Sequence, residues 1–103
     1  MNSEMKKIIN LSYWLSLDKN LNIENKKCEN VNLINNVLIE CATKNDDAIF
    51  KLLNKNVTKI KLLQKLLIET NLIENVRKEV EEDIKETKII ISTYSKVLIE
   101  RNL

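Results

Sequence analysis

The sequence contains no glycine, no proline and no histidine in 103 residues. Average usage would supply roughly a dozen glycines and prolines in a chain of this length. Tight β-hairpin turns depend on glycine, and both residues interrupt helices, so their absence disfavours a β-protein and permits long helices. The sequence therefore predicts an all-α protein.

The same absences restrict the chemistry that the chain can perform. Without histidine the commonest acid–base catalyst is missing, and without glycine the phosphate-binding loops of nucleotide enzymes cannot be built. Cys41 has no histidine to activate it, and Glu79 with Asp83, one helical turn apart, is better explained as a solvated acidic face than as a metal site. We expect no enzyme, and no catalytic, cofactor-binding or metal-binding residues.

Overall composition indicates one folded domain, residues 1–103. Hydrophobic residues make up 44% of the chain, and the formal net charge is only +2. A charge this small gives no compositional argument for a nucleic-acid or anionic-membrane partner. Lysine, asparagine and isoleucine are abundant while alanine occurs only at Ala42 and Ala48, which indicates a gene from an AT-rich genome.

The two cysteines and the short apolar runs indicate where in the cell the protein is located. If Cys28 and Cys41 share one helix they lie about 20 Å apart, too far for a disulfide. Packed, reduced thiols are therefore expected. No apolar run approaches the roughly 20 residues of a membrane span. The sequence predicts an intracellular protein, cytoplasmic or nuclear, without a membrane span.

Apolar residues recur at helical spacing in four segments, which predicts a bundle of about four helices. The predicted helices cover about residues 3–17, 29–43, 46–69 and 71–101, and a polar, asparagine-rich loop covers 18–27. The expected core stripes are Met5, Ile8, Ile9, Leu11 and Leu15 in the first helix, and Val31, Ile34, Leu38 and Cys41 in the second, where Leu33 and Val37 widen the apolar face. Before the third helix, Asn45 is a natural N-cap, and Asp46 and Asp47 suit the first turn.

The last two helices are expected to form an antiparallel hairpin that turns near Asn71. Asn71 and Glu74 have the spacing of a capping box. Lysines predominate before this point and acids after it, so folding back would place Lys61 near Glu81 and Lys59 near Asp83. The alternative is one straight coiled-coil helix of roughly 85 Å from residue 46 to the end.

The lysines of the third helix form a candidate basic face. They are Lys51, Lys55, Lys59, Lys61 and Lys65. Such a row suits a phosphate backbone, but no aromatic residue lies among them to stack on bases. A solvated face, or the partner of the acidic stretch, is the preferred interpretation.

Excess apolar surface in the first and last helices suggests protein binding. The candidate partner-binding residues are Tyr13, Trp14, Leu17, Ile91, Tyr94 and Leu98. The favoured function is a non-catalytic helical interaction module, a small subunit of a larger intracellular assembly joined by helical packing to copies of itself or to other proteins. The alternatives are a compact helical inhibitor or immunity-type protein that sequesters one target, and a nucleic-acid adaptor that uses the lysine face. We recognise no family in these motifs.

Overall fold

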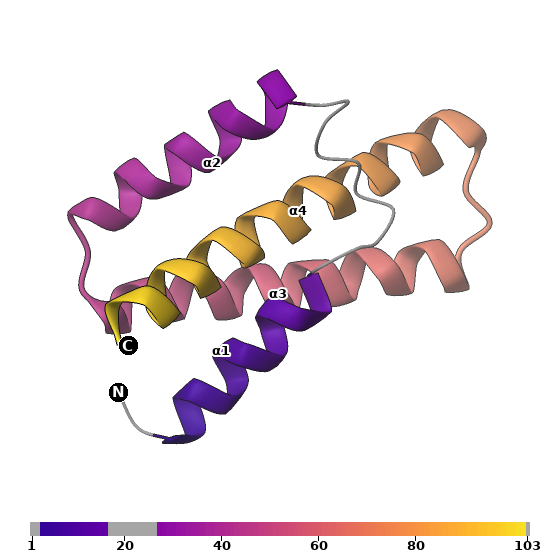
Figure 1. Ribbon diagram of the computed structural model, residues 1–103. Helices are drawn as coiled ribbons and strands as arrows, with labels where there is room; N and C mark the ends of the chain where they lie inside the picture. The colour runs from indigo at the N-terminus through magenta and orange to yellow at the C-terminus, as the bar shows by residue number, and fades with distance from the viewer. Residues whose placement is uncertain (1–2, 17–26, 103) are drawn as a thin grey trace.

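The structure is a computed structural model that describes residues 3–16 and 27–102 (Figure 1). It contains four helices: α1 (Ser3–Ser16), α2 (Lys27–Ala42), α3 (Asp46–Glu69) and α4 (Glu74–Arg101). The described residues include no strand. The prediction of an all-α bundle of four helices is confirmed. The predicted loop at 18–27 lies outside the described residues except for its last position, and so do the side chains at 4, 14–16 and 27–30.

The start of α3 is set by local sequence. The side chain of Asn45 accepts a hydrogen bond from the Ala48 backbone N–H at 2.9 Å, while Asp46 and Asp47 occupy the first turn. The Asn45 side chain satisfies a backbone N–H that has no partner within the helix. The two aspartate carboxylates interact favourably with the positive end of the helix dipole. The predicted cap is confirmed.

The chain turns between α3 and α4, and the two helices run antiparallel side by side (Figure 1). The backbone is extended at Thr70 (φ −115°, ψ 134°) and at Ile73 (φ −65°, ψ 153°), which ends one helix and begins the next. The structure therefore contains the predicted hairpin and not the straight rod. The predicted capping box is wrong, because Ile73 and not Asn71 occupies the N-cap of α4 and no side chain caps the helix.

Helix α4 is the central element of the bundle. Among the described residues it packs against α1, α2 and α3, which have few contacts with one another (Figure 1). Thr93, Tyr94 and Ser95 are all buried although successive residues point about 100° apart. The last turns of α4 are therefore enclosed on most sides. The core cluster consists of Ile9, Val37, Cys41, Ile49, Leu53, Ile60, Val80, Ile84, Ile91, Tyr94 and Leu98.

Two of the polar residues buried along α4 satisfy their hydroxyl groups within the helix itself. Thr87 Oγ1 donates to the Asp83 carbonyl at 2.6 Å, and Thr93 Oγ1 donates to the Ile89 carbonyl at 2.8 Å. Ser95 is fully buried, but its Oγ has no hydrogen-bond partner among the described residues. An unpaired buried hydroxyl costs about 1–3 kcal/mol, so Ser95 is a local weakness of the core.

The core-facing sides of α1 and α2 differ from the predicted stripes. In α1, Ile9 and Ser12 are buried, whereas Ile8 and Leu11 are exposed. In α2, Val37 and Cys41 are buried, whereas the predicted core residues Val31 and Leu38 are exposed. Apolar residues cover a wide part of the circumference of both helices, and packing against α4 buries only some of them. The prediction of a packed thiol is confirmed for Cys41, which is free and buried.

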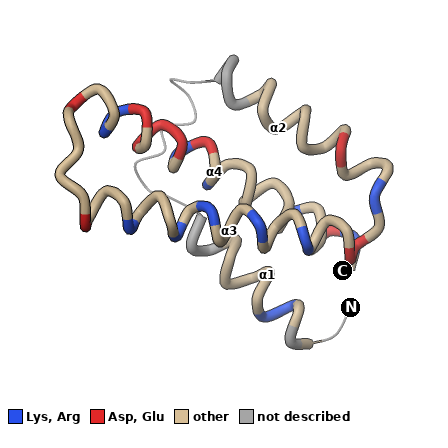
Figure 2. The backbone as a smooth tube through the Cα atoms, turned by 180° about the vertical axis from the view of Figure 1, so that it is seen from behind, with Lys and Arg blue, Asp and Glu red and all other residues tan. Residues whose placement is uncertain are grey.

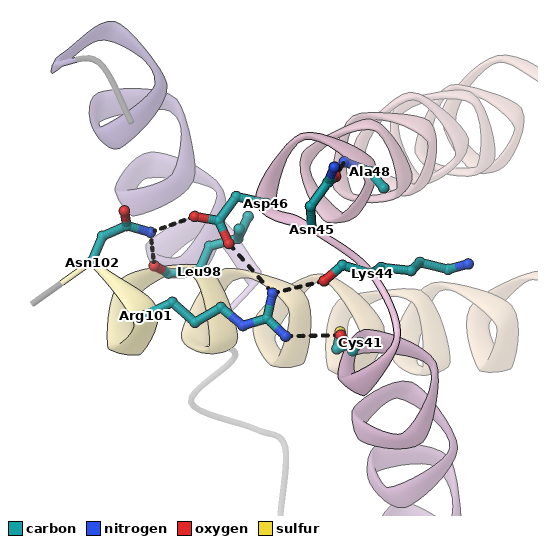
Figure 3. Close-up of polar contacts among 8 residues, drawn as sticks. All are labelled: Cys41, Lys44, Asn45, Asp46, Ala48, Leu98, Arg101 and Asn102. Atoms are coloured by element: carbon teal, nitrogen blue, oxygen red, sulfur yellow. Dashed lines mark hydrogen bonds and ion pairs between the residues drawn. The ribbon is translucent and has the colours of Figure 1, made fainter.

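Arg101 joins the end of α4 to the connection between α2 and α3 (Figure 3). Its guanidinium donates to the Cys41 carbonyl at 2.8 Å and to the Lys44 carbonyl at 2.9 Å, and lies 3.4 Å from Asp46 Oδ1. Carbonyl groups at a helix C-terminus lack helical partners and attract a cation. We call Arg101 and these three partners the clasp.

Asn102 adds two hydrogen bonds beside the clasp. Its Nδ2 donates to Asp46 Oδ2 at 3.2 Å and to the Leu98 carbonyl at 2.8 Å (Figure 3). Asp46 therefore contacts both residues that end α4. The end of α4 is fixed against the first turn of α3.

Candidate functional site

Exposed apolar residues concentrate at the end of the hairpin. Of the ten large apolar side chains that are exposed among the described residues, five lie in the segment 62–76, which we call the hairpin tip. They are Leu62, Leu66, Ile68, Ile73 and Val76. Ile68 is 83% exposed and Leu62 is 63% exposed. Because half of the exposed set falls in so short a segment, the tip is the strongest candidate for a binding surface.

The tip is exposed because only two helices reach it. Figure 1 shows that the ends of α3 and α4 extend beyond α1 and α2, and the reverse view in Figure 2 agrees. The last buried residue of α3 is Ile60, and the first buried residue of α4 is Val80. Beyond these positions a two-helix hairpin can cover only the sides that face each other. The remaining apolar side chains face solvent.

A shallow groove lies on the outer face of α3. Its lining residues are Lys55, Thr58, Lys59, Leu62, Leu63 and Leu66. Leu53 is fully buried and lies nine residues before Leu62, which places the two about 180° apart around the helix. The groove is therefore on the side of α3 opposite the core, and binding there does not require the bundle to open.

Lysines continue this face toward the start of α3. Lys51, Lys55 and Lys59 follow one another at four-residue intervals and are exposed. None of the three forms an ion pair with a described residue. Lys61 lies about 200° around the helix from Lys59 and so points elsewhere. Lys65 is paired with Glu69 at 3.9 Å. The structure brings together only three of the five predicted lysines as an unpaired row.

The acidic stretch of α4 lies beside α3 in the hairpin but does not neutralise this row (Figure 2). No ion pair joins the described residues Lys61 and Glu81, or Lys59 and Asp83, so the predicted cross-hairpin pairs are wrong. The pairs found near the tip lie within one helix, such as Lys78 with Glu74 at 3.7 Å. Each exposed pair contributes only about 0–1 kcal/mol.

Most of the predicted partner-binding residues are not at this surface. Ile91, Tyr94 and Leu98 are core residues of the folded chain, so they do not face a partner. Tyr13 is half-buried in α1 and has a contact of its own. Leu17 and the Trp14 side chain lie outside the described residues, so their role in partner binding stays a prediction.

Sequence reasoning missed the leucines of the groove. Ile60, Leu63 and Leu67 have the spacing of a core stripe in α3, and they are buried or half-buried. Leu62 and Leu66 stand outside that stripe at four-residue spacing. Apolar residues left over from a core stripe are the signal that could have identified this face.

The two buried titratable groups with shifted pKa values, Tyr94 and Cys41, lie where α2 packs against α4. Tyr94 Oη donates to Glu40 Oε2 at 3.0 Å. Burial, followed by the hydrogen bond to Glu40, raises the pKa of Tyr94 well above its ordinary value. Burial likewise raises the pKa of the Cys41 thiol, although the charge of Arg101 opposes the shift. A raised thiol pKa means that a smaller fraction is thiolate, so Cys41 is less nucleophilic than a solvent-exposed cysteine.

Metal-ligating side chains do not gather anywhere in the described part of the chain in a group of three or more. Over residues 3–16 and 27–102, no helix combines the length and apolar character needed to cross a membrane. No protein-family model matches the sequence, and comparisons with curated proteins and with solved structures find no similar chain. The tip and the groove on α3 therefore remain the features from which a function is inferred.

Proposed function

We propose that this chain is a non-catalytic helical interaction protein, a small subunit of a larger intracellular assembly, and that it contacts its partner through the hairpin tip. The observation that supports this proposal is the clustering of exposed Leu62, Leu66, Ile68, Ile73 and Val76 on two helices with no third helix over them. Several large apolar side chains left exposed within a short segment of a folded domain are a mark of a binding surface.

Burial of the tip would supply the driving force for association. Fully burying one leucine or isoleucine side chain gains about 1.5–3 kcal/mol. Ile68, at 83% exposed, has most of this free energy still to gain. The surrounding lysines and acids keep the free subunit in solution. A free, buried Cys41 thiol also fits the reducing interior of a cell.

The experiment is a pull-down from the native source with two matched double variants. Leu62→Ser with Ile68→Ser alters the tip at side chains that are 63% and 83% exposed. Leu11→Ser with Ile39→Ser makes the same chemical change at side chains that are 61% and 70% exposed, on α1 and α2. Exposed substitutions of this kind change stability by about 0.5 kcal/mol or less, so both variants should fold.

We expect the wild type and the Leu11/Ile39 variant to retain the same partner proteins, and the Leu62/Ile68 variant to lose them. Circular dichroism of each variant shows whether the helices are intact. Retention of an identical set of proteins by both double variants would contradict the proposal.

A further inference from the structure

We infer that the groove on the outer face of α3 binds an acidic amphipathic helix of a partner protein. This inference depends on the proposed function and names the class of segment that the surface recognises. The groove and the lysine row together form one stripe along α3: Lys51, Lys55, Lys59, Leu62 and Leu66. We call this set the α3 stripe.

The length of the α3 stripe fits a helical segment. Lys51 and Leu66 are fifteen residues apart, which corresponds to about 22 Å along the helix axis, or roughly four turns. The residues succeed one another at steps of four, four, three and four. Side chains at these intervals lie along one face of a helix, which is the arrangement that another helix packs against. The stripe can therefore accept a partner helix of about fifteen residues.

The two halves of the stripe require two kinds of contact. Near the tip, Leu62, Leu63 and Leu66 provide an apolar surface that aliphatic side chains of the partner would cover. Toward the start of α3, Lys51, Lys55 and Lys59 are exposed and have no ion pair with a described residue. Between residues 48 and 68, α3 carries no acid. The partner must therefore carry leucine-like residues at one end and carboxylates at the other.

This combination disfavours a phosphate ligand. Nucleic acid or an anionic lipid headgroup would use the lysines but would leave the three leucines in water. The net charge of +2 is also small for a phosphate-binding protein.

A second copy of this chain also fits less well than a different protein. The chain has an acidic helix of its own, and on the face that carries Glu79, Asp83 and Glu86 its exposed apolar residue is Val76, which is 38% exposed. That face could pair with the lysines, but one partly exposed valine would cover less of Leu62 and Leu66 than a row of leucines. The complementary segment therefore belongs to another protein.

The test uses a fluorescein-labelled heptad peptide of about 18 residues, with Leu at positions a and d in one half and Glu at positions a and d in the other half. Fluorescence anisotropy measures its binding to the full-length protein. A scrambled peptide of the same composition controls for charge alone. We expect saturable binding of the heptad peptide and much weaker binding of the scrambled one. Binding should also weaken as salt shortens the Debye length.

Two pairs of matched variants test the two halves of the stripe. Lys55→Glu with Lys59→Glu reverses the charge of the row, and Lys61→Glu with Lys96→Glu makes the same change at exposed lysines outside it. Leu62→Ser with Leu66→Ser removes the apolar half, and the control is again Leu11→Ser with Ile39→Ser. We expect each stripe variant to weaken binding by roughly tenfold or more, and each control to stay within about twofold.

A charge swap separates lost recognition from lost folding. A peptide with Lys in place of Glu should bind the Lys55→Glu/Lys59→Glu protein better than it binds the wild type. That rescue cannot occur in an unfolded variant. Equal binding of the heptad and scrambled peptides, or an equal loss in the control variants, would overturn the inference.

The remaining outcomes identify other occupants. Binding of duplex DNA or of phosphatidylserine vesicles that depends on Lys55 and Lys59, without peptide binding, would show a phosphate surface instead. If sedimentation shows that the wild type is a dimer and that the Lys55→Glu/Lys59→Glu variant is a monomer, the occupant of the stripe is a second copy of this chain. If the peptide fails to bind while the tip variant still loses its natural partner, only the acidic helix is wrong. If the tip variant loses no partner either, the proposed function is also wrong.

Discussion

Replacing Arg101 with alanine tests whether the clasp stabilises the bundle. The Arg101 side chain is 35% exposed, and its guanidinium reaches the Cys41 and Lys44 carbonyls and the Asp46 carboxylate. The partly buried hydrogen bond to Cys41 should contribute about 1–1.5 kcal/mol, somewhat below the range of about 1.5–3 kcal/mol for charged donors, because solvent screens it. The exposed hydrogen bond to Lys44 and the ion pair with Asp46 should add about 0.5 kcal/mol each.

The expected loss on Arg101→Ala is therefore about 2 kcal/mol in the free energy of unfolding. Domains of this size are stable by only about 5–15 kcal/mol, so the change is easily measured. It corresponds to a fall of roughly 10 °C in Tm. The loss is not larger because the Cys41 carbonyl keeps a second hydrogen bond, from the Lys44 backbone N–H at 3.1 Å.

Urea denaturation followed by circular dichroism is the appropriate assay. Arg101→Lys keeps the charge but cannot reach three acceptors from one planar group, so it should recover about half of the loss at most. Lys96→Ala, at an exposed lysine of the same helix, should change stability by less than about 0.5 kcal/mol. A loss on Arg101→Ala no greater than that of Lys96→Ala would refute this account of the clasp.

Two further predictions concern buried hydroxyl groups of α4. Ser95→Ala removes an unpaired Oγ and should raise the free energy of unfolding by about 1 kcal/mol, more than Ser92→Ala does at a half-buried position of the same helix. A urea midpoint for Ser95→Ala that is unchanged or lower would contradict this. For Tyr94, the raised pKa means that the folded state keeps its proton more tightly than the unfolded chain. Its contribution to stability should therefore be complete below about pH 9–10 and decline as the pH rises further. Tyr94→Phe should cost about 1 kcal/mol at pH 7, because the hydrogen bond to Glu40 is lost, and should flatten the alkaline decline in urea titrations. If the stability of Tyr94→Phe declines equally steeply at alkaline pH, the titration of another group causes the decline.

Features that depend on neighbouring residues were predictable from sequence. The Asn45 cap and the two aspartates after it act within one turn, and the structure shows them as expected. The turn near residue 70 was also predicted, although the described residues Lys61 and Glu81, and Lys59 and Asp83, do not form the expected ion pairs across it. The capping box at Asn71 was wrong because the chain stays extended until Ile73, which is the N-cap of α4 without a side-chain hydrogen bond.

Features that depend on distant residues were not predictable in the same way. Ile8 and Leu11 in α1 have the spacing of a core stripe but are exposed. The side of α1 that is buried depends on α4, which follows more than fifty residues later. For the same reason Ile91 and Tyr94 were interpreted as surplus surface, since nothing in the sequence marks α4 as the helix that the others surround. The site was predicted only in part: the lysines were identified, but the leucines beside them were not.

The central place of α4 has a consequence for the order in which the chain can fold during synthesis. Helices α1, α2 and α3 leave the ribosome before α4, yet their buried residues Ile9, Val37 and Ile49 pack around it. At about 5–20 residues per second, the 28 residues of α4 take a few seconds to synthesise. During that interval three apolar faces are exposed without their shared partner. Contacts between α1 and α4 also close most of the chain into a loop, which slows folding relative to bundles with mainly local contacts. The nascent chain is therefore open to chaperones, or to misassembly, until α4 has emerged.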